Sequence, residues 1–414
     1  MSTNSAGSSA IGSGHEGNVK EQISGYLLKI KSGDMGSLPA MLGLVILAIL
    51  FTAMSPVFLT ALNFANLFNQ AATLIVLAMG LVFVLVLAEI DLSAGVTAGV
   101  SAAILVISLH NNVNWILSIL IAIVAGVVIG YFIGVIVARV GIPSFVVTLA
   151  CFLAFQGLQL LIIGNGGLYR IENSQVLAIQ NSNLTLLQGW IFYAVGILLF
   201  IYSGFAARRR RSRNNQPNRP MVFLYAKIAF AVVAGAGVVA ALNLERSSNK
   251  DFPIHGVPIV IPVVIVLFVL GTFVLDRTKF GRHVYAVGGN PEAARRAGIK
   301  VTGVKIAVFT ICSTTAAISG IISASRVGSV DASMGRTIVL NGVAAAVVGG
   351  VSLFGGKGRL SQAVIGGFVI AIIDNGLGLM GYNSGINLLI TGAVLLLAAS
   401  ADAISRKRGS VVKR

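Results

Sequence analysis

The sequence predicts an all-α polytopic membrane protein with about twelve transmembrane helices. Hydrophobic residues make up 56% of the 414 residues, charged residues make up 10%, and the mean hydropathy is +0.91. An ordinary soluble domain carries about 25% charged residues, so this composition lies well outside that class. The apolar residues also gather in stretches of roughly 20, the length at which a helix crosses the hydrocarbon core of a bilayer.

Apolar segments of this length are expected to cross the membrane one after another. In chain order they are residues 38–54, 71–88, 92–109, 115–138, 144–163, 190–207, 221–242, 257–275, 306–325, 338–356, 360–380 and 386–403. Residues 1–37 begin with a Ser- and Gly-rich stretch that has no apolar core, which predicts a largely disordered cytoplasmic tail rather than a signal peptide. The transmembrane domain, residues 38–403, is followed by a basic cytoplasmic tail, residues 404–414.

Both termini are expected on the cytoplasmic side, because most of the 30 Lys and Arg residues then fall in cytoplasmic tails and loops. The largest basic loops are 208–219 and 276–305. The basic residues expected outside are Arg170, Arg246, Lys250, Arg326 and Arg336. The net charge of +17 is therefore a topology signal, so the expected partner is the lipid bilayer and not nucleic acid.

The sequence offers no site typical of an enzyme. The stretch FGGKG at 354–358 lacks the Ser or Thr after Lys357 and the spaced first glycine of a phosphate-binding loop, so the chain is not expected to hydrolyse ATP itself. Potential metal ligands and nucleophiles are scattered, which predicts neither a metal site nor a catalytic residue. They are His15, His110, His255, His283, Cys151 and Cys312.

Ionisable residues in the apolar segments are candidates for a translocation path or gate, because a charge at mid-bilayer is costly. Glu89 and Asp91 occur in AEIDLSAG, and Asp374 precedes Asn375 in AIIDNGLG. Two interpretations stay open for the first pair: Asp91 and Ser93 cap the following helix, or the acids line the path. Asp374 either bonds a polar residue such as Asn341 across a helix interface or contacts the substrate. An ion-driven carrier would need more carboxylates near the bilayer centre.

Glycines at helical spacing predict closely packed helices. They include Gly126, Gly130 and Gly134, the pair Gly349 and Gly350, and the pair Gly366 and Gly367. Residues four apart share one face of a helix, and without side chains they let two backbones approach closely. A compact bundle is expected rather than a wide pore.

The polar loop 276–305 contains the signals of a short helix. Asn290 is a favourable N-cap, Pro291 suits the first helical position, Glu292 suits the positive end of the helix dipole, and Gly298 can end the helix in a left-handed conformation. A helix of about seven residues is expected. Its small residues Ala293, Ala294 and Ala297 give one side flat enough to enter a groove, beside Arg295 and Arg296.

The run GRHVYAVGGNPEAARRAGI resembles the cytoplasmic loop of bacterial ABC sugar-importer permeases of the ribose, galactose and xylose group. The likeness extends to AEIDLSAG, PSFVVTLACFLAFQG, ISGIISASRVGS and VVGGVSLFGGKG, and it covers the chain from about Asn66 to Arg406. The resemblance implies a permease subunit in the bacterial plasma membrane that pairs with a second copy. It also implies a cytoplasmic ATPase subunit that holds ATP and Mg²⁺, and an external sugar-binding protein.

In that family the loop forms a coupling helix that sits in a cleft of the ATPase subunit. The resemblance carries this role onto Gly288, Gly289, Asn290, Glu292, Ala293, Ala294, Arg295 and Gly298. The external segment with Arg326, Asp331 and Arg336 is either a dock for the binding protein or a solvated loop.

Residues 165–256 are longer than the corresponding loop of ribose-type members and contain an additional helix pair with the basic loop 208–219. This pair resembles the xylose-type permeases, which implies a pentose such as D-xylose. The chain departs from the family at Val339-Leu340-Asn341, where members usually carry Glu-Leu-Asp. A permease for branched-chain amino acids or an autoinducer, an ion-coupled secondary transporter and a structural or receptor-like protein stay open as alternatives.

Overall fold

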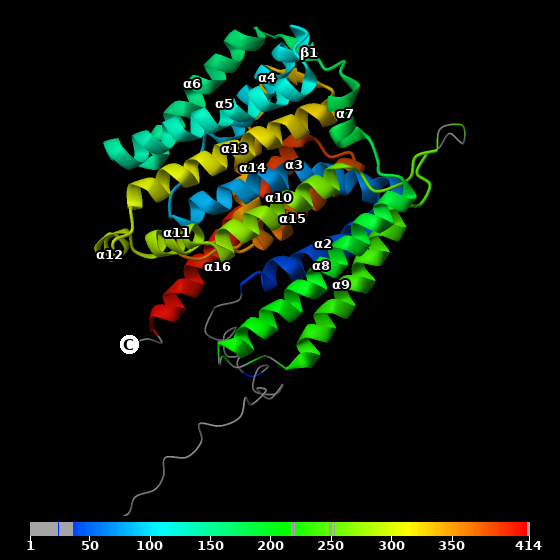
Figure 1. The fold of residues 1–414 in the computed structure, drawn as a ribbon. Coiled ribbons are helices and arrows are strands. Elements are labelled where there is room, and N and C mark those ends of the chain that lie inside the picture. The colour runs from blue at the N-terminus through cyan, green and yellow to red at the C-terminus, as the bar shows by residue number, and fades with distance from the viewer. Residues whose placement is uncertain are drawn as a thin grey trace, which may run out of the picture.

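The computed structural model describes residue 24 and residues 36–411, apart from 165, 215, 217, 219, 248–250 and 252, with side chains as far as residue 400. The cytoplasmic tail expected at 1–37 therefore lies almost wholly outside the described residues. The described chain forms a bundle of helices with one small two-stranded sheet (Figure 1). The elements in chain order are α2 (Leu38–Met54), α3 (Ala61–Val86), α4 (Ala94–His110), α5 (Trp115–Val135), η1 (Ile136–Val140), α6 (Ser144–Ile163), β1 (Leu168–Arg170), α7 (Ser174–Asn181), α8 (Leu186–Arg213), α9 (Met221–Leu242), α10 (Val260–Arg277), α11 (Lys279–Gly289), α12 (Pro291–Arg296), α13 (Val301–Val327), β2 (Ser329–Asp331), α14 (Ile338–Val348), α15 (Leu360–Leu379) and α16 (Ser384–Val411).

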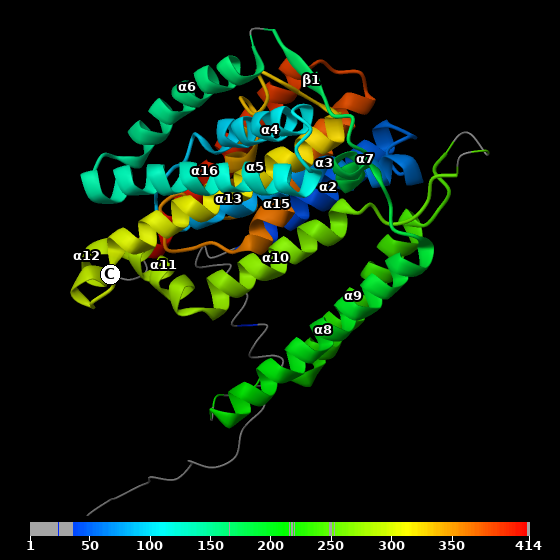
Figure 2. The same cartoon turned by 45° about the horizontal axis from the view of Figure 1, so that its top comes forward.

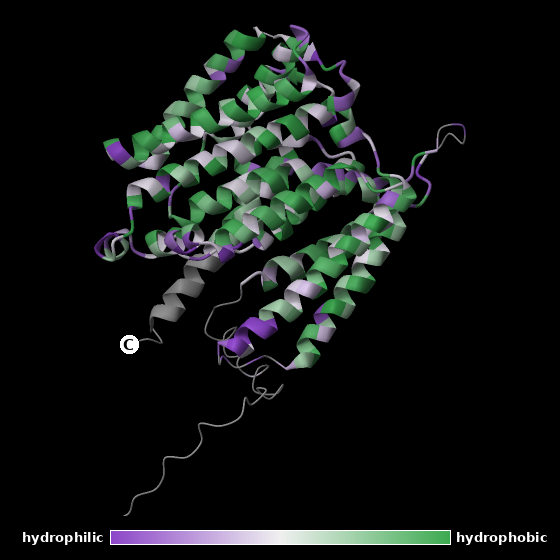
Figure 3. Ribbon diagram, in the orientation of Figure 1, coloured by the Kyte–Doolittle hydropathy of each residue, from purple (hydrophilic) through white to green (hydrophobic). Residues whose placement is uncertain are grey.

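The predicted all-α membrane architecture is confirmed. Eight helices of the described chain are long and apolar enough to cross a bilayer, and four shorter apolar helices accompany them. Apolar residues run along the helices, whereas polar residues gather at their ends (Figure 3). One end, called the basic end below, contains α11, α12 and the arginine-rich terminus of α8. By the positive-inside rule it is the end expected to face the cytoplasm, and this orientation stays a prediction.

The segment 338–356 does not form the full span expected of it. Helix α14 has only 11 residues, about 16 Å, which is half the thickness of the hydrocarbon core. The chain then turns through Gly350, Gly355 and Gly356, all at positive φ, where residues with a side chain are strained. At the other end of the sequence, the basic tail expected from residue 404 continues α16 as far as Val411.

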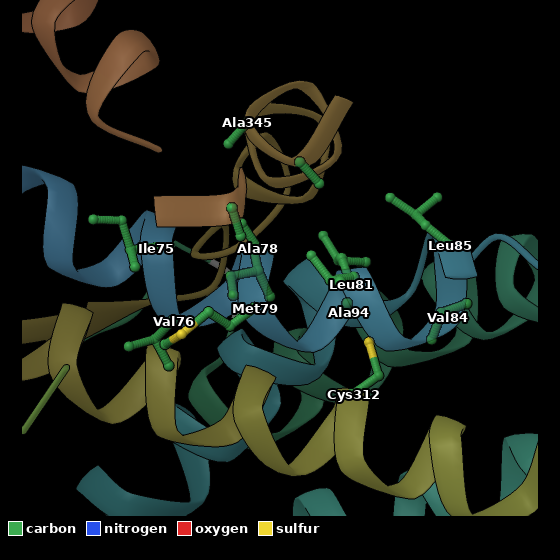
Figure 4. Close-up of a cluster of buried hydrophobic side chains, with 14 of the residues drawn as sticks. Ile75, Val76, Ala78, Met79, Leu81, Val84, Leu85, Ala94, Cys312 and Ala345 are labelled. Atoms are coloured by element: carbon green, nitrogen blue, oxygen red, sulfur yellow. The ribbon is translucent and has the colours of Figure 1, made fainter. Parts of the chain in front are cut away.

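Helix α3 forms the centre of the bundle. All of its residues from Ala71 to Val86 are buried, and it packs against α13, α14 and α15. Figure 4 shows Ile75, Met79 and Leu81 of this helix among side chains from its neighbours, including Ala345 of α14. Because every residue from Ala71 to Val86 is buried, this part of α3 is surrounded by protein rather than by lipid.

Glycines bring the helices into backbone contact, as predicted. Gly126, Gly130 and Gly134 of α5 all face α13, where an added Cβ would stand 2.6 to 2.8 Å from atoms of that helix. A Cβ at Gly366 of α15 would overlap the carbonyl oxygen of Ala345 in α14. These interfaces therefore leave no room for any larger residue.

The additional helix pair expected within 165–256 consists of α8 and α9, which pack on each other beside the bundle (Figure 2). Their contact with α3 lies near the end opposite the basic end, where Val239, Leu242 and Val257 pack on Ala65. The chain enters and leaves the pair at one place. There the Leu184 amide donates to the Val257 carbonyl (2.8 Å) and the Ile259 amide donates to the Ser182 carbonyl (3.0 Å).

The end opposite the basic end contains two elements that the sequence did not reveal. Strand β1 pairs antiparallel with β2, which places Arg170 opposite Ser329. Helix α7 lies across the ends of α3 and α13, because the Gln180 side chain donates to the Asn69 carbonyl (2.6 Å) and the Asn181 side chain donates to the Ser325 carbonyl (2.8 Å).

Candidate functional site

Helix α12 begins and ends as the sequence predicts. The Asn290 side chain accepts a hydrogen bond from the Ala293 amide (2.9 Å), and Pro291 occupies the first turn. Glu292 pairs with Arg295 on the surface (2.9 Å). Gly298 follows the helix with φ of +82°, the left-handed conformation that ends it. The predicted helix of about seven residues is confirmed, with six residues observed.

The prediction that Ala294 belongs to the flat outer side of this helix is wrong. Ala294 is buried, with 4% of its surface exposed, and it packs in the main hydrophobic core of the chain itself. Ala293 and Ala297 are exposed instead, and their spacing of four residues places them on one face. A partner can therefore reach Ala293 and Ala297 but not Ala294.

Helix α11, which immediately precedes α12, was not predicted. Thr278 caps it by accepting the Gly281 amide (3.1 Å), and its inward face carries the buried Val284 and Val287 with Phe280 one turn earlier. The spacing Phe280, Val284, Val287 is a helical period that could have revealed it. The basic residues within 276–305 concealed the pattern, because they lower the average hydropathy of the segment.

Three segments meet at the inner side of α11. The Gly356 amide donates to the carbonyl of Val86, the last residue of α3 (2.8 Å). Gly288 of α11 lies against the same carbonyl, and the Tyr285 hydroxyl donates to the Gly358 carbonyl (2.6 Å). Burial, and to a smaller degree the neighbouring Asp276 carboxylate, raises the pKa of Tyr285 to about 12. The hydroxyl thus keeps its proton, and its donor role, at neutral pH.

Glu89 also lies at the basic end, paired with Lys305 of α13. A pocket of about 260 Å³ adjoins this pair, and Arg295 of α12 and Ser144 of α6 line it too. The segment is tied to α6 because the Ile90 amide donates to the Ser144 hydroxyl (3.2 Å). Glu89 is therefore a neighbour of the coupling-helix candidate rather than an acid at mid-bilayer.

We expect the Glu89 and Lys305 side chains to stabilise the protein as a pair. They are 15% and 23% exposed, so removing one leaves the other partly buried without its partner. Glu89→Gln and Lys305→Met should each lower the midpoint of thermal unfolding. The loss of unfolding free energy in the double variant should be smaller than the sum of the two single losses by about 0.5–3 kcal/mol. Additive effects in thermal unfolding of the purified protein would contradict this coupling.

Asp91 is buried and its carboxylate shapes the turn before α4. Its Oδ1 accepts the Ser93 amide (2.9 Å) and the Ser93 hydroxyl (2.6 Å). These bonds hold the turn that leads into α4. Ser93 does not form the expected cap, because its side chain bonds Asp91 and makes no cap hydrogen bond to α4, and a role of Asp91 in the path stays a prediction.

Asn375 of α15 forms hydrogen bonds across a helix interface with α3. Its amide and that of Asn63 in α3 form two reciprocal hydrogen bonds of 2.8 and 2.9 Å. The expected bond between Asp374 and Asn341 is not formed, and within the described part of the chain neither side chain makes a hydrogen bond or ion pair with another residue. Both are partly buried, so they keep polar groups available inside the bundle.

The candidate docking residues lie together at the end opposite the basic end. Arg326 and Arg336 are exposed on either side of β2. Asp331 is half-buried and turns the chain by accepting the Ser333 amide (2.7 Å), while its carbonyl accepts the Gln159 side chain (2.9 Å). The arginines are thus free to meet a partner, whereas Asp331 serves the local fold; docking itself stays a prediction.

Comparison with known proteins agrees with this arrangement. A family model described as "Branched-chain amino acid transport system / permease component" matches residues 63–399. The chain belongs to this permease family. Its members supply the membrane component of transport systems, in keeping with the multi-pass helices described here.

Individual members of the permease family are similar to the chain over most of their length. The xylose transport system permease protein XylH of Escherichia coli K12 is 34% identical over 85% of this chain and 87% of its own. XylH of Haemophilus influenzae is 33% identical over 88% and 95%. The ribose import permease protein RbsC of Bacillus subtilis is 30% identical over 89% and 94%. No solved structure matches the chain significantly.

Proposed function

We propose that this chain is the membrane-spanning subunit of an ATP-driven ABC importer that carries a monosaccharide, D-xylose or a related pentose, across the bacterial plasma membrane. The observation that carries the proposal is the 34% identity with the XylH xylose permease over 85% of the chain. The ribose permease RbsC is 30% identical, so relatives for two pentoses cover nearly the same region. The additional pair α8 and α9 favours the xylose type.

Energy for transport would come from a separate cytoplasmic ATPase subunit, which holds ATP and Mg²⁺, while this chain binds no cofactor. Its own contribution is α12, which offers Ala293 and Ala297 as a flat exposed face at the basic end. A helix of six residues is too short to be stable alone, so its cap and its buried Ala294 hold it in place for a partner. A second copy of the chain and an external sugar-binding protein, met by Arg326 and Arg336, would complete the importer.

The path through the bundle would use the polar side chains that have no structural partner. Asp374 and Asn341 fit this requirement, because both are partly buried and neither side chain has a hydrogen-bond partner among the described residues. Asp91 fits it in part, since Ser93 occupies its Oδ1 while its buried Oδ2 has no hydrogen-bond partner in the part of the molecule that the structure describes. Asn375 fits it less well, since Asn63 bonds its amide. Glu89 would act as a gate residue through its pair with Lys305.

Calorimetry of the external binding protein that copurifies with this chain tests the substrate. We expect it to bind D-xylose or another pentose and to ignore leucine, because the named relatives are pentose permeases. Tight binding of leucine without any response to sugars would instead favour a branched-chain amino-acid permease, the solute that the family description names. Uptake abolished by collapsing the ion gradient at constant ATP would point to an ion-coupled carrier, for which Asp374 is the candidate residue.

A further inference from the structure

The loop between α14 and α15 is attached to α11, although Tyr285 and Gly358, which form the hydrogen bond, are 73 residues apart in sequence. Gly356 donates its amide to Val86, and Gly358 accepts the Tyr285 hydroxyl. Two further hydrogen bonds hold the loop itself. The Ser352 amide donates to the Lys357 carbonyl (3.2 Å) within the loop, and the Gln362 side chain of α15 donates to the Gly350 carbonyl at its start (2.9 Å). The loop is thus an ordered element that touches α3 and α11 at once.

Glycine is required at this contact because the chains meet backbone to backbone. A Cβ at Gly288 would overlap the Val86 carbonyl and stand 3.1 Å from the Gly356 nitrogen. A Cβ at Gly355 would stand 2.7 Å from the Gly288 carbonyl oxygen. By contrast, a Cβ at Gly289, the next residue of α11, would meet nothing within 4 Å. Only one of the two adjacent glycines is therefore dictated by the contact.

Helices α11 and α12 are joined without a linker. Asn290 is both the residue that ends α11, where its amide donates to the Ala286 carbonyl (3.1 Å), and the N-cap of α12. Its side chain then accepts the Ala293 amide. A push on α12 therefore displaces α11 directly, because no flexible residue lies between them to absorb the movement.

We infer that Tyr285 and Gly288 of α11, Val86 of α3 and the loop Gly355–Gly358 form a clasp through which movement of α12 reaches the end of α3 and the turn between α14 and α15. This inference rests on the proposed function, in which α12 receives the movement of an ATPase. Covalently, α12 is continuous only with α10 through α11 and with α13. Helix α13 also packs on α3, and the clasp gives α12 a second connection, to the end of α3 and to the turn after the half-length helix α14, so that packed helices move as units. Tyr285 and Gly288 are positioning residues and touch no substrate.

A reconstituted complex with the ATPase subunit and the binding protein loaded with D-xylose tests the clasp. We expect Gly288→Ala to lower uptake per ATP hydrolysed by at least about tenfold, within the usual range of coupling between sites. The control variant Gly303→Ala in α13, where an added Cβ would meet nothing within 4 Å, should stay within about twofold of the unmodified protein and retain basal hydrolysis. Copurification of the ATPase subunit with Gly288→Ala separates a loss of coupling from a loss of binding. Equal coupling in the two variants would overturn the inference.

Tyr285→Phe keeps the test decisive if Gly288→Ala fails to fold, because it removes one hydroxyl and leaves the volume of the ring. The loss of the bond to Gly358 should lower the ratio of uptake to hydrolysis about fivefold. Unchanged stoichiometry in Tyr285→Phe would contradict the clasp. If the unmodified complex itself shows no sugar-stimulated hydrolysis, the proposed function fails, which is a different outcome from equal behaviour of the variants.

Spin labels at Lys300→Cys and Phe354→Cys provide a readout that needs no sugar. Both positions are exposed, one just after α12 and the other in the loop. Trapping the complex with ATP and vanadate should leave the distance between the labels unchanged, because the clasp moves as one body. In Gly288→Ala the same distance distribution should broaden. A change of several ångströms on trapping in the otherwise unmodified chain would show that α12 and the loop move apart, against the inference.

Discussion

Replacing Ala293 by arginine is expected to abolish the stimulation of ATP hydrolysis by the sugar-loaded binding protein, while the chain still inserts and folds. Ala293 is exposed on α12, so the long side chain extends into the space that a partner's cleft would occupy. We expect the affinity for the ATPase subunit to fall more than about tenfold, the equivalent of about 1.4 kcal/mol. Copurification measures the affinity for the ATPase subunit, and ATPase assays measure the stimulation by the sugar-loaded binding protein.

Two variants control this experiment. Ala293→Ser adds only one hydroxyl group, which leaves the exposed face small, so coupling should stay within about twofold of the unmodified protein. Ala294→Arg places the same arginine on the inward side of the helix, where Ala294 is buried, and should lower the unfolding temperature instead. If Ala293→Arg left stimulated hydrolysis unchanged, α12 would not be the element that receives the ATPase.

Replacing Gly366 by alanine is expected to destabilise the bundle strongly, although only one methyl group is added. The new Cβ would overlap the Ala345 carbonyl, which belongs to the backbone of α14 and cannot rotate away. The two helices must separate, and overpacking of this kind costs about 1–3 kcal/mol or more. Gly378→Ala in the same helix is the matched control, because its Cβ would meet nothing within 4 Å. Thermal unfolding in detergent compares them, and equal midpoints would contradict the close packing of α14 and α15.

Local signals allowed the helices to be predicted well where they are apolar and capped. The segments at 144–163 and 221–242 agree with α6 and α9, and Asn290 and Gly298 mark α12 correctly. Helix α3 starts ten residues before the expected segment at 71, because Asn63 and its polar neighbours lower the hydropathy there. In the structure Asn63 bonds Asn375, so its polarity is satisfied by a residue far along the chain.

The candidate site was less predictable, because its roles depend on contacts between distant segments. Nothing near Ala294 in the sequence distinguishes it from Ala293, and only the packing on the core shows which one faces inward. The contact between Gly288 and Gly356 is equally invisible in one sequence. In the sequence, the stretch FGGKG could be assessed only as a phosphate-binding loop, and nothing in it indicated that α11 and the end of α3 were the elements it meets.

The single point at which α8 and α9 join the rest of the chain has an evolutionary consequence. Residues 182–184 and 257–259 are already hydrogen-bonded side by side, so an ancestral gene could gain or lose the whole pair in one event. A chain rejoined there keeps every later helix in its original direction, because two crossings are added or removed together. We infer that the pair can be gained or lost as one unit without reversing the direction of any later helix.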